Sequence, residues 1–202
     1  MYKINSIFPI PIYTTNVKEI ISEEDLDYIK NKQQVSYKNE GNLTSKDTYL
    51  FKNKKYDRIQ NKIMEHVNEY FKEVINTSDR IVPYITQSWF NFTKETQFHH
   101  HHSHTNSVLS GVLYISADKK YDIISFHKLT RDQIELKPKK FNLYNSDSWR
   151  FPVETGDLFL FPATLAHSVP KKEGNNLRIS LAFNVFVKGS LGREGDLNEL
   201  LL

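Results

Sequence analysis

A run of histidines in the middle of the chain is the group of residues best suited to chemistry. His99 to His102 are consecutive, His104 follows after one serine, and His167 lies further along. Residues two apart on a strand point to the same face, so His102 and His104 can point together into the interior of a barrel. His167 follows the apolar stretch 158–162 and can reach them from another strand. Because neutral imidazoles bind iron, zinc, copper and nickel, the three predict a metal centre with open coordination positions.

The segment that begins at Arg178 indicates a partner for this centre. In strand geometry Arg178, Ser180 and Asn184 share one polar face, whereas the alternate residues from 179 to 185 are bulky and apolar. A guanidinium binds a carboxylate through two parallel hydrogen bonds, and the hydroxyl of Ser180 can add a third. No acidic residue lies between 175 and 187, so a buried Arg178 needs a carboxylate from elsewhere in the chain or from a ligand. A carboxylate anchor close to the metal is therefore expected.

Four blocks of sequence resemble the non-haem iron(II) and 2-oxoglutarate-dependent oxygenases, in particular the prolyl-hydroxylase-like branch with a histidine-x-histidine pair before a serine-glycine strand. The blocks occur in the family's order and cover about the C-terminal half of the chain. They are HSHTNSVLSGVLY at 102–114, GDLFLFP at 156–162, HSVP at 167–170 and RISLAFN at 178–184.

The resemblance implies a role for each of these residues. His102, His104 and His167 would hold Fe(II), and Arg178 and Ser180 would bind the distal carboxylate of the cosubstrate 2-oxoglutarate, with O2 as the third reactant. The further candidates for contacts around the cosubstrate are chosen by strand face and position alone, and they are Asn184 and Tyr114. The implied reaction couples oxidative decarboxylation of 2-oxoglutarate to hydroxylation of a substrate. The substrate stays unidentified and could be a small molecule or a protein side chain such as proline.

One departure from the family concerns His104, because better-known members have a carboxylate at this position. Three neutral ligands leave the charge of the metal to be balanced by the dianionic 2-oxoglutarate. The register within the run is also open, because other pairs between His99 and His102 have the same spacing. The pair His102 and His104 is chosen because its distance to Ser110 and Gly111 fits the family pattern.

Two other functions remain open. One is a cupin-like metal protein with three histidines that does not use 2-oxoglutarate, for which Arg178 would be dispensable. The other is a non-catalytic binding module that neither binds nor consumes 2-oxoglutarate. Taken singly, His99, His100 and His101 are more simply adventitious metal-binding residues on a loop, and His66 and His127 are interpreted as ordinary surface or packing residues.

Composition narrows the class of protein. A chain of 202 residues fits one domain, and the net charge of +3, from 27 basic and 24 acidic residues, argues against nucleic acid as a partner. The absence of cysteine excludes disulfides and thiol sites and fits a reducing cytoplasm. Residues 1–15 do not have the pattern of a signal peptide, and no segment has membrane-spanning length. We expect a soluble intracellular protein without a membrane partner, and a homodimer stays open.

Periodicity predicts two helices followed by strands. Ser22 to Asp25 has the pattern of a capping box for a helix to about Lys32, and an apolar stripe predicts a second helix over 56–75 that packs outside the β core. The expected strands are 87–92, 98–102, 108–116, 123–126, 158–161 and 177–187. Several short strands separated by turns favour a mainly β (α+β) jelly-roll, cupin-like barrel with N-terminal flanking helices. The family resemblance implies a double-stranded β-helix with the metal at its mouth.

The chain is expected to form a single domain with three parts. Residues 1–80 would be a helical N-terminal region on the barrel, 84–188 the double-stranded β-helix core, and 189–202 a C-terminal tail. The polar, lysine-rich stretch 128–153 would be a long connection between two strands, either a lid or a segment packed on the barrel. No residue in it is assigned a role.

Overall fold

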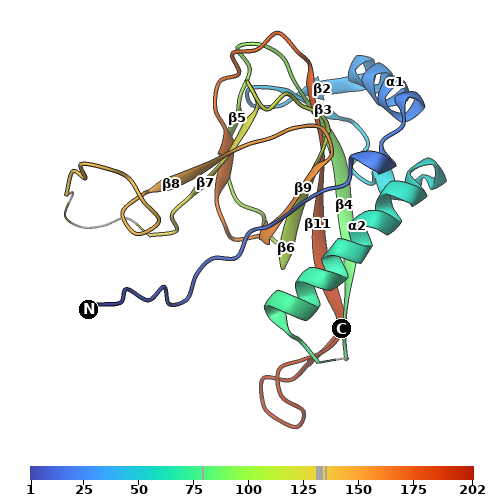
Figure 1. Ribbon diagram of the computed structural model, residues 1–202. Coiled ribbons are helices and arrows are strands. Elements are labelled where there is room, and N and C mark those ends of the chain that lie inside the picture. The colour runs from blue at the N-terminus through green and yellow to red at the C-terminus, as the bar shows by residue number, and fades with distance from the viewer. Residues whose placement is uncertain (79, 131–133, 135) are drawn as a thin grey trace.

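Two antiparallel sheets face each other in the computed structural model, which describes residues 1–78, 80–130, 134 and 136–202 (Figure 1). The larger sheet has the strand order β1-β9-β6-β11-β4-β3-β2 with β12 paired to β11, and the smaller has the order β5-β10-β7-β8. The strands are β1 Tyr13–Asn16, β2 Ser36–Lys38, β3 Leu43–Ser45, β4 Ile81–Thr93, β5 His99–His102, β6 Leu109–Ser116, β7 Ile123–His127, β8 Ser148–Pro152, β9 Asp157–Pro162, β10 His167–Val169, β11 Arg178–Leu191 and β12 Leu200–Leu201.

Strand β11 is the centre of the larger sheet. It pairs with β4 on one side and β6 on the other over most of its length. The apolar side chains of its outer face are fully buried, and they pack in one cluster with Ile59, Ile63 and Val67 of helix α2 (Asp57–Tyr70). Burial of each such side chain contributes about 1.5–3 kcal/mol. The predicted outer position of this helix is therefore confirmed.

Local signals define both helices. Helix α1 (Glu23–Lys32) begins after Ser22, whose side chain accepts from the backbone N–H of Asp25 while Asp25 accepts from the backbone N–H of Ser22. This reciprocal pair is the predicted capping box. Helix α2 continues into a π turn, Phe71–Ile75, that ends at Asn76 in the left-handed conformation. Shorter 3-10 turns cover Lys18–Ile20, Gln33–Val35, Leu50–Lys52 and Lys54–Tyr56.

The structure contains short strands that the sequence did not predict. The first 80 residues, expected to be helical, contribute β1, β2 and β3 to the larger sheet. Strand β8 lies within the stretch 128–153 that was expected to be a connection, and four of its five residues are exposed. Strands of three to five residues have too few positions for a clear apolar alternation, so their pairing partners decide their conformation.

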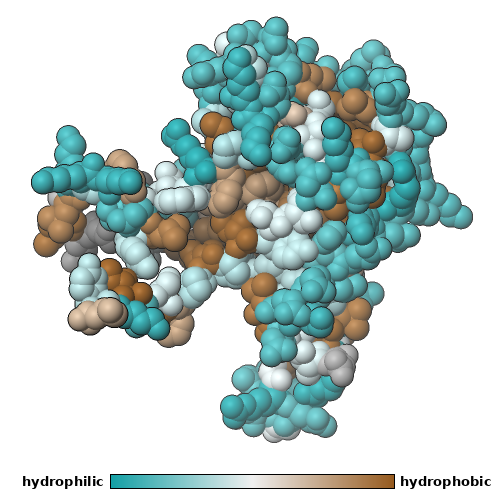
Figure 2. Space-filling view, in the orientation of Figure 1, coloured by the Kyte–Doolittle hydropathy of each residue, from teal (hydrophilic) through white to brown (hydrophobic). Residues whose placement is uncertain are grey.

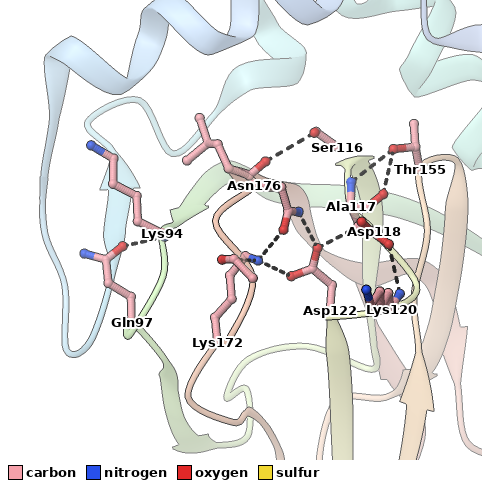
Figure 3. A network of polar contacts seen from close by, with 12 residues as sticks. Lys94, Gln97, Ser116, Ala117, Asp118, Lys120, Asp122, Thr155, Lys172 and Asn176 are labelled. Atoms are coloured by element: carbon pink, nitrogen blue, oxygen red, sulfur yellow. Dashed lines mark hydrogen bonds and ion pairs between the residues drawn. The ribbon is translucent and has the colours of Figure 1, made fainter.

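A buried polar network holds the connection that leads into β11. The side chains of Lys172, Asn176 and Asp122 point toward one another (Figure 3). The Nζ atom of Lys172 lies 3.3 Å from an oxygen of Asp122 and donates to the carbonyl of Gly174, while Asn176 donates to the other oxygen of Asp122. Only 1% of each charged side chain is exposed, so removing either charge would leave the other buried without its partner. The network therefore fixes the chain immediately before Arg178.

Apolar side chains are exposed on two segments that extend from the barrel. The N-terminal residues and the described part of the connection between β7 and β8 extend toward the left of Figure 1, and Figure 2 shows apolar side chains on the projecting part. The exposed apolar residues include Ile7 and Phe8 in the first segment and Phe141 and Leu143 in the second. No helix among the described residues is long and apolar enough to cross a membrane.

Candidate active site

The three predicted metal ligands lie together at one end of the space between the sheets. His102 ends β5 and pairs directly with His167, the first residue of β10. His104 follows two residues later, and its backbone N–H donates to the carbonyl of Ala163. The ring centroids are 4.3 Å apart for His102 and His167, 5.1 Å for His102 and His104, and 5.2 Å for His104 and His167. One potential ligand atom from each ring lies within 4.8 Å of the other two.

Hydrogen bonds determine which nitrogen of two of these rings is free. The Nδ1 of His102 lies 2.9 Å from the carbonyl oxygen of His100, and the Nδ1 of His167 lies 3.1 Å from that of Leu165. A carbonyl can only accept, so both Nδ1 atoms must donate. The lone pair is then on Nε2 in both rings, and a backbone carbonyl holding the opposite N–H is the usual arrangement around a metal-binding histidine.

The electrostatics keep all three imidazoles neutral. Burial is the largest cause, and it lowers the pKa of His167 to about 3 and that of His104 to about 4, with the neighbouring His102 adding to both shifts. Burial also lowers the pKa of His102, partly opposed by its hydrogen bond to the carbonyl of His100. Only neutral imidazole has a lone pair for a metal, so the trio is ready to bind at neutral pH.

Arg178 lies on the inner face of β11 and is 4% exposed. Its Nε and Nη1 atoms are buried without a hydrogen-bond partner among the described residues, and the same holds for the hydroxyl of Tyr114. The guanidinium carbon lies 5.1 Å from the centre of the Tyr114 ring. Burial raises the pKa of Tyr114 to about 12, so its hydroxyl stays a donor. These unsatisfied donors are suited to a buried anion.

Ser180 and Asn184 occupy different parts of the same inner face. Ser180 is buried and pairs with Tyr114 of β6 and Asn91 of β4, next to Arg178. Asn184 lies about 20 Å further along the strand than Arg178, at about 3.3 Å per residue. The hydroxyl of Ser110 donates to its side-chain oxygen at 3.0 Å. Asn184 therefore stays a candidate only for contacts near the middle of β11, away from Arg178.

An open pocket of about 250 Å³ adjoins the histidines. Its wall comes from β4, the hairpin of β2 and β3, and the histidine run, and the sequence reasoning did not identify the contribution of the first two. Trp89 of β4 lies with its ring centre 5.8 Å from that of His104. Trp89 shares a strand face with the polar Asn91, and this alternation could have indicated that it faces the site. The sequence of the hairpin has no comparable pattern. The lining residues are Tyr37, Asn39, Thr44, Thr48, Gln87, Trp89, His99, His102 and His104.

Residues 87–184 match the family model described as putative 2OG-Fe(II) oxygenase, and this range includes every candidate site residue. No curated protein sequence matches the chain. Among solved structures, a 2OG-Fe(II) oxygenase family oxidoreductase from Burkholderia pseudomallei is similar, with a TM-score of 0.58, 12% identity and coverage of 86% of this chain and 83% of that one.

Two further solved structures have the same fold. A prolyl-4-hydroxylase from Pseudomonas putida has a TM-score of 0.58 and 9% identity, over 87% of this chain and 92% of its own. HygX from Streptomyces hygroscopicus, solved with nickel, 2-oxoglutarate and hygromycin B, has a TM-score of 0.56 and 9% identity, over 87% and 82%. At such identities the likeness shows the fold, which is the expected double-stranded β-helix. Residues 87–184, almost half of the chain, match the model of the putative 2OG-Fe(II) oxygenase family, and these solved structures share the fold.

Proposed function

We propose that this protein is an Fe(II)- and 2-oxoglutarate-dependent dioxygenase that hydroxylates its substrate, with His102, His104 and His167 as the metal ligands. One observation carries the proposal. Three neutral imidazoles converge within 4.8 Å, and the same barrel interior contains a buried arginine with two nitrogen atoms that no described residue pairs. A metal and a carboxylate ligand together satisfy both halves of the site.

The donor set fits iron. Imidazole nitrogen is a good ligand for Fe(II), and three of them leave coordination positions for other ligands. When bound, Fe(II) together with 2-oxoglutarate and O2 would supply the oxidising power for C–H hydroxylation. The protein holds the ring nitrogens in place through the carbonyls of His100 and Leu165.

The inner face of β11 fits the cosubstrate. Arg178 and Ser180 would bind the distal carboxylate of 2-oxoglutarate, and the hydroxyl of Tyr114 would add a hydrogen bond. A ligand anion there would pair the guanidinium, which has unsatisfied donors in a water-poor environment. Three neutral metal ligands leave the metal's full charge to be balanced, and a dianionic cosubstrate would contribute that balance.

The substrate would enter through the pocket beside Trp89 and His104. At neutral pH its lining is uncharged and combines two aromatic rings with hydroxyl and amide groups. HygX was solved with hygromycin B and the Pseudomonas putida relative is a prolyl-4-hydroxylase. We propose a neutral, polar group as the part of the substrate that reacts, on a small molecule or on a protein side chain such as proline.

Other properties stay predictions. A single domain with a barrel core over 84–188, a cytoplasmic location, a homodimer and the absence of a nucleic-acid partner are each proposed from the sequence. Light scattering of the purified protein would test the oligomeric state.

An anaerobic titration tests the proposed function. Metal-free protein receives Fe(II) and then 2-oxoglutarate, while the visible charge-transfer band of the chelated oxo acid is recorded. We expect the band in the wild type, none in His167→Ala, and a requirement for far more 2-oxoglutarate in Arg178→Ala. His127→Ala is the matched control, because His127 lies near the site without belonging to the trio. Iron binding without a band in the wild type would instead support a metal protein that does not use the oxo acid.

A further inference from the structure

A second triangle of imidazoles adjoins the first. The ring centroids of His99, His100 and His102 are separated by 5.1 Å for the first two, 4.6 Å for His99 and His102, and 4.8 Å for His100 and His102. These separations match those of the first trio, and one potential ligand atom from each ring again lies within 4.8 Å of the others. His102 belongs to both groups.

A β-bulge brings the second triangle together. Between the pairs His167 with His102 and Val169 with His99, β10 advances by two residues while β5 advances by three. An extra residue on one strand reverses the alternation of side chains beyond it. His99 and His102, which would otherwise point to opposite faces, are thereby stacked ring on ring.

The surroundings of the second triangle resemble a ligand site more than a solvated tract. His99 and His102 both line the open pocket. The Nδ1 of His100 is buried without a hydrogen-bond partner among the described residues, and an oxygen of Glu40 lies 3.8 Å from it. On the opposite side of the strand, the exposed His101 has His127 as a ring neighbour at 4.5 Å, and the described residues form no group of three suitable ligands there.

We propose that His99, His100 and His102 form a second divalent-metal site that is mutually exclusive with the first. Because the Nδ1 of His102 donates to a carbonyl, this ring has only Nε2 available for a metal. One lone pair binds one ion, so a metal in the second site removes a ligand from the first. Zinc and nickel bind imidazole more tightly than Fe(II) does, and they are the class of ion expected in the second site.

A metal in the second site has a consequence for the first, because the two sites share His102. Such a metal would leave the protein loaded but without the complete first trio.

The test uses anaerobic titration of full-length, metal-free protein with Co(II), followed by its visible absorption and by elemental analysis. We expect one equivalent in the wild type and one in His104→Ala/His167→Ala, which retains only the second site. Adding His99→Ala and His100→Ala to this variant should weaken binding by more than about 100-fold. Adding His101→Ala instead is the matched control and should leave one equivalent bound. His102→Ala should weaken binding at both sites.

Three results would overturn the proposal. The first is that His104→Ala/His167→Ala keeps the wild-type circular dichroism but binds no cobalt. The second is that adding His101→Ala to this variant abolishes binding as effectively as adding the His99 and His100 changes. The third is that the wild type binds two equivalents. If the double variant fails to fold, His104→Gln/His167→Gln replaces it. Failure of the 2-oxoglutarate band would sink the proposed function alone, because the cobalt measurement needs neither cosubstrate nor turnover.

Discussion

The two faces of strand β11 have the same backbone and opposite environments. Its outer residues, such as Leu181 and Phe183, are fully buried against α2 and the neighbouring strands. Its inner residues Arg178 and Ser180 are nearly as buried, but two nitrogen atoms of Arg178 have no partner in the part of the chain that the structure describes. The outer face is complete without a ligand, whereas the inner face is not. Stability and ligand binding should therefore respond separately to substitutions on alternate residues.

The largest expected effect is on the outer face. Phe183→Ala removes a fully buried ring from the main core and should lower the free energy of unfolding by about 3–5 kcal/mol. Urea denaturation followed by circular dichroism measures the change. The affinity of the folded fraction for 2-oxoglutarate should stay at the wild-type value. A large loss of affinity in protein that remains folded would show that the two faces are coupled.

Arg178→Met is the corresponding change on the inner face. It should reduce the binding free energy of 2-oxoglutarate by about 2–5 kcal/mol, because a buried carboxylate loses its charged partner. Without ligand, the variant should be as stable as the wild type or more stable, since an incompletely paired buried charge is removed. Titration of the charge-transfer band and urea denaturation measure the two effects. Marked destabilisation of the ligand-free protein would mean that Arg178 has a structural role.

Gly111 sharpens the comparison because it is the cross-strand neighbour of Phe183. A Cβ at this position would lie 2.2 Å from the Phe183 ring. Gly111→Ala should therefore destabilise the fold by about 1–3 kcal/mol through overpacking. Gly111→Ala/Phe183→Leu should recover part of that loss relative to the sum of the two single changes. Strict additivity in this double-mutant cycle would contradict the contact.

Ser180→Ala should have the smallest effect. Loss of one hydrogen bond to a carboxylate that Arg178 still pairs should cost about 1.5 kcal/mol of binding free energy, the low end for a charged acceptor. The titration used for Arg178→Met measures it, and Ala182→Ser on the same face is the control. If Ser180→Ala binds 2-oxoglutarate as tightly as the wild type, the serine hydroxyl makes no contact with it.

Much of the fold could be predicted because long elements have clear periodicity. The stripe on α2 and the alternation along β11 each place an apolar face against a core, and both predictions are confirmed. Strands β1, β2 and β3 have three or four residues each, too few for a period, and they form because the larger sheet offers them a partner. For the same reason the hairpin wall of the pocket could not be predicted.

The candidate site also has a part that the sequence predicts and a part that it does not. The spacing of His102 and His104 and the alternation of Arg178 and Ser180 are local properties of strands, so the sequence alone determined which side chains share a face. The extra residue in β5 is a property of its pairing with β10, and only the tertiary structure decided that His99 lies beside His102. Strand period is encoded by consecutive residues, whereas register depends on two segments far apart in the chain, which is why the second histidine triangle could not be predicted.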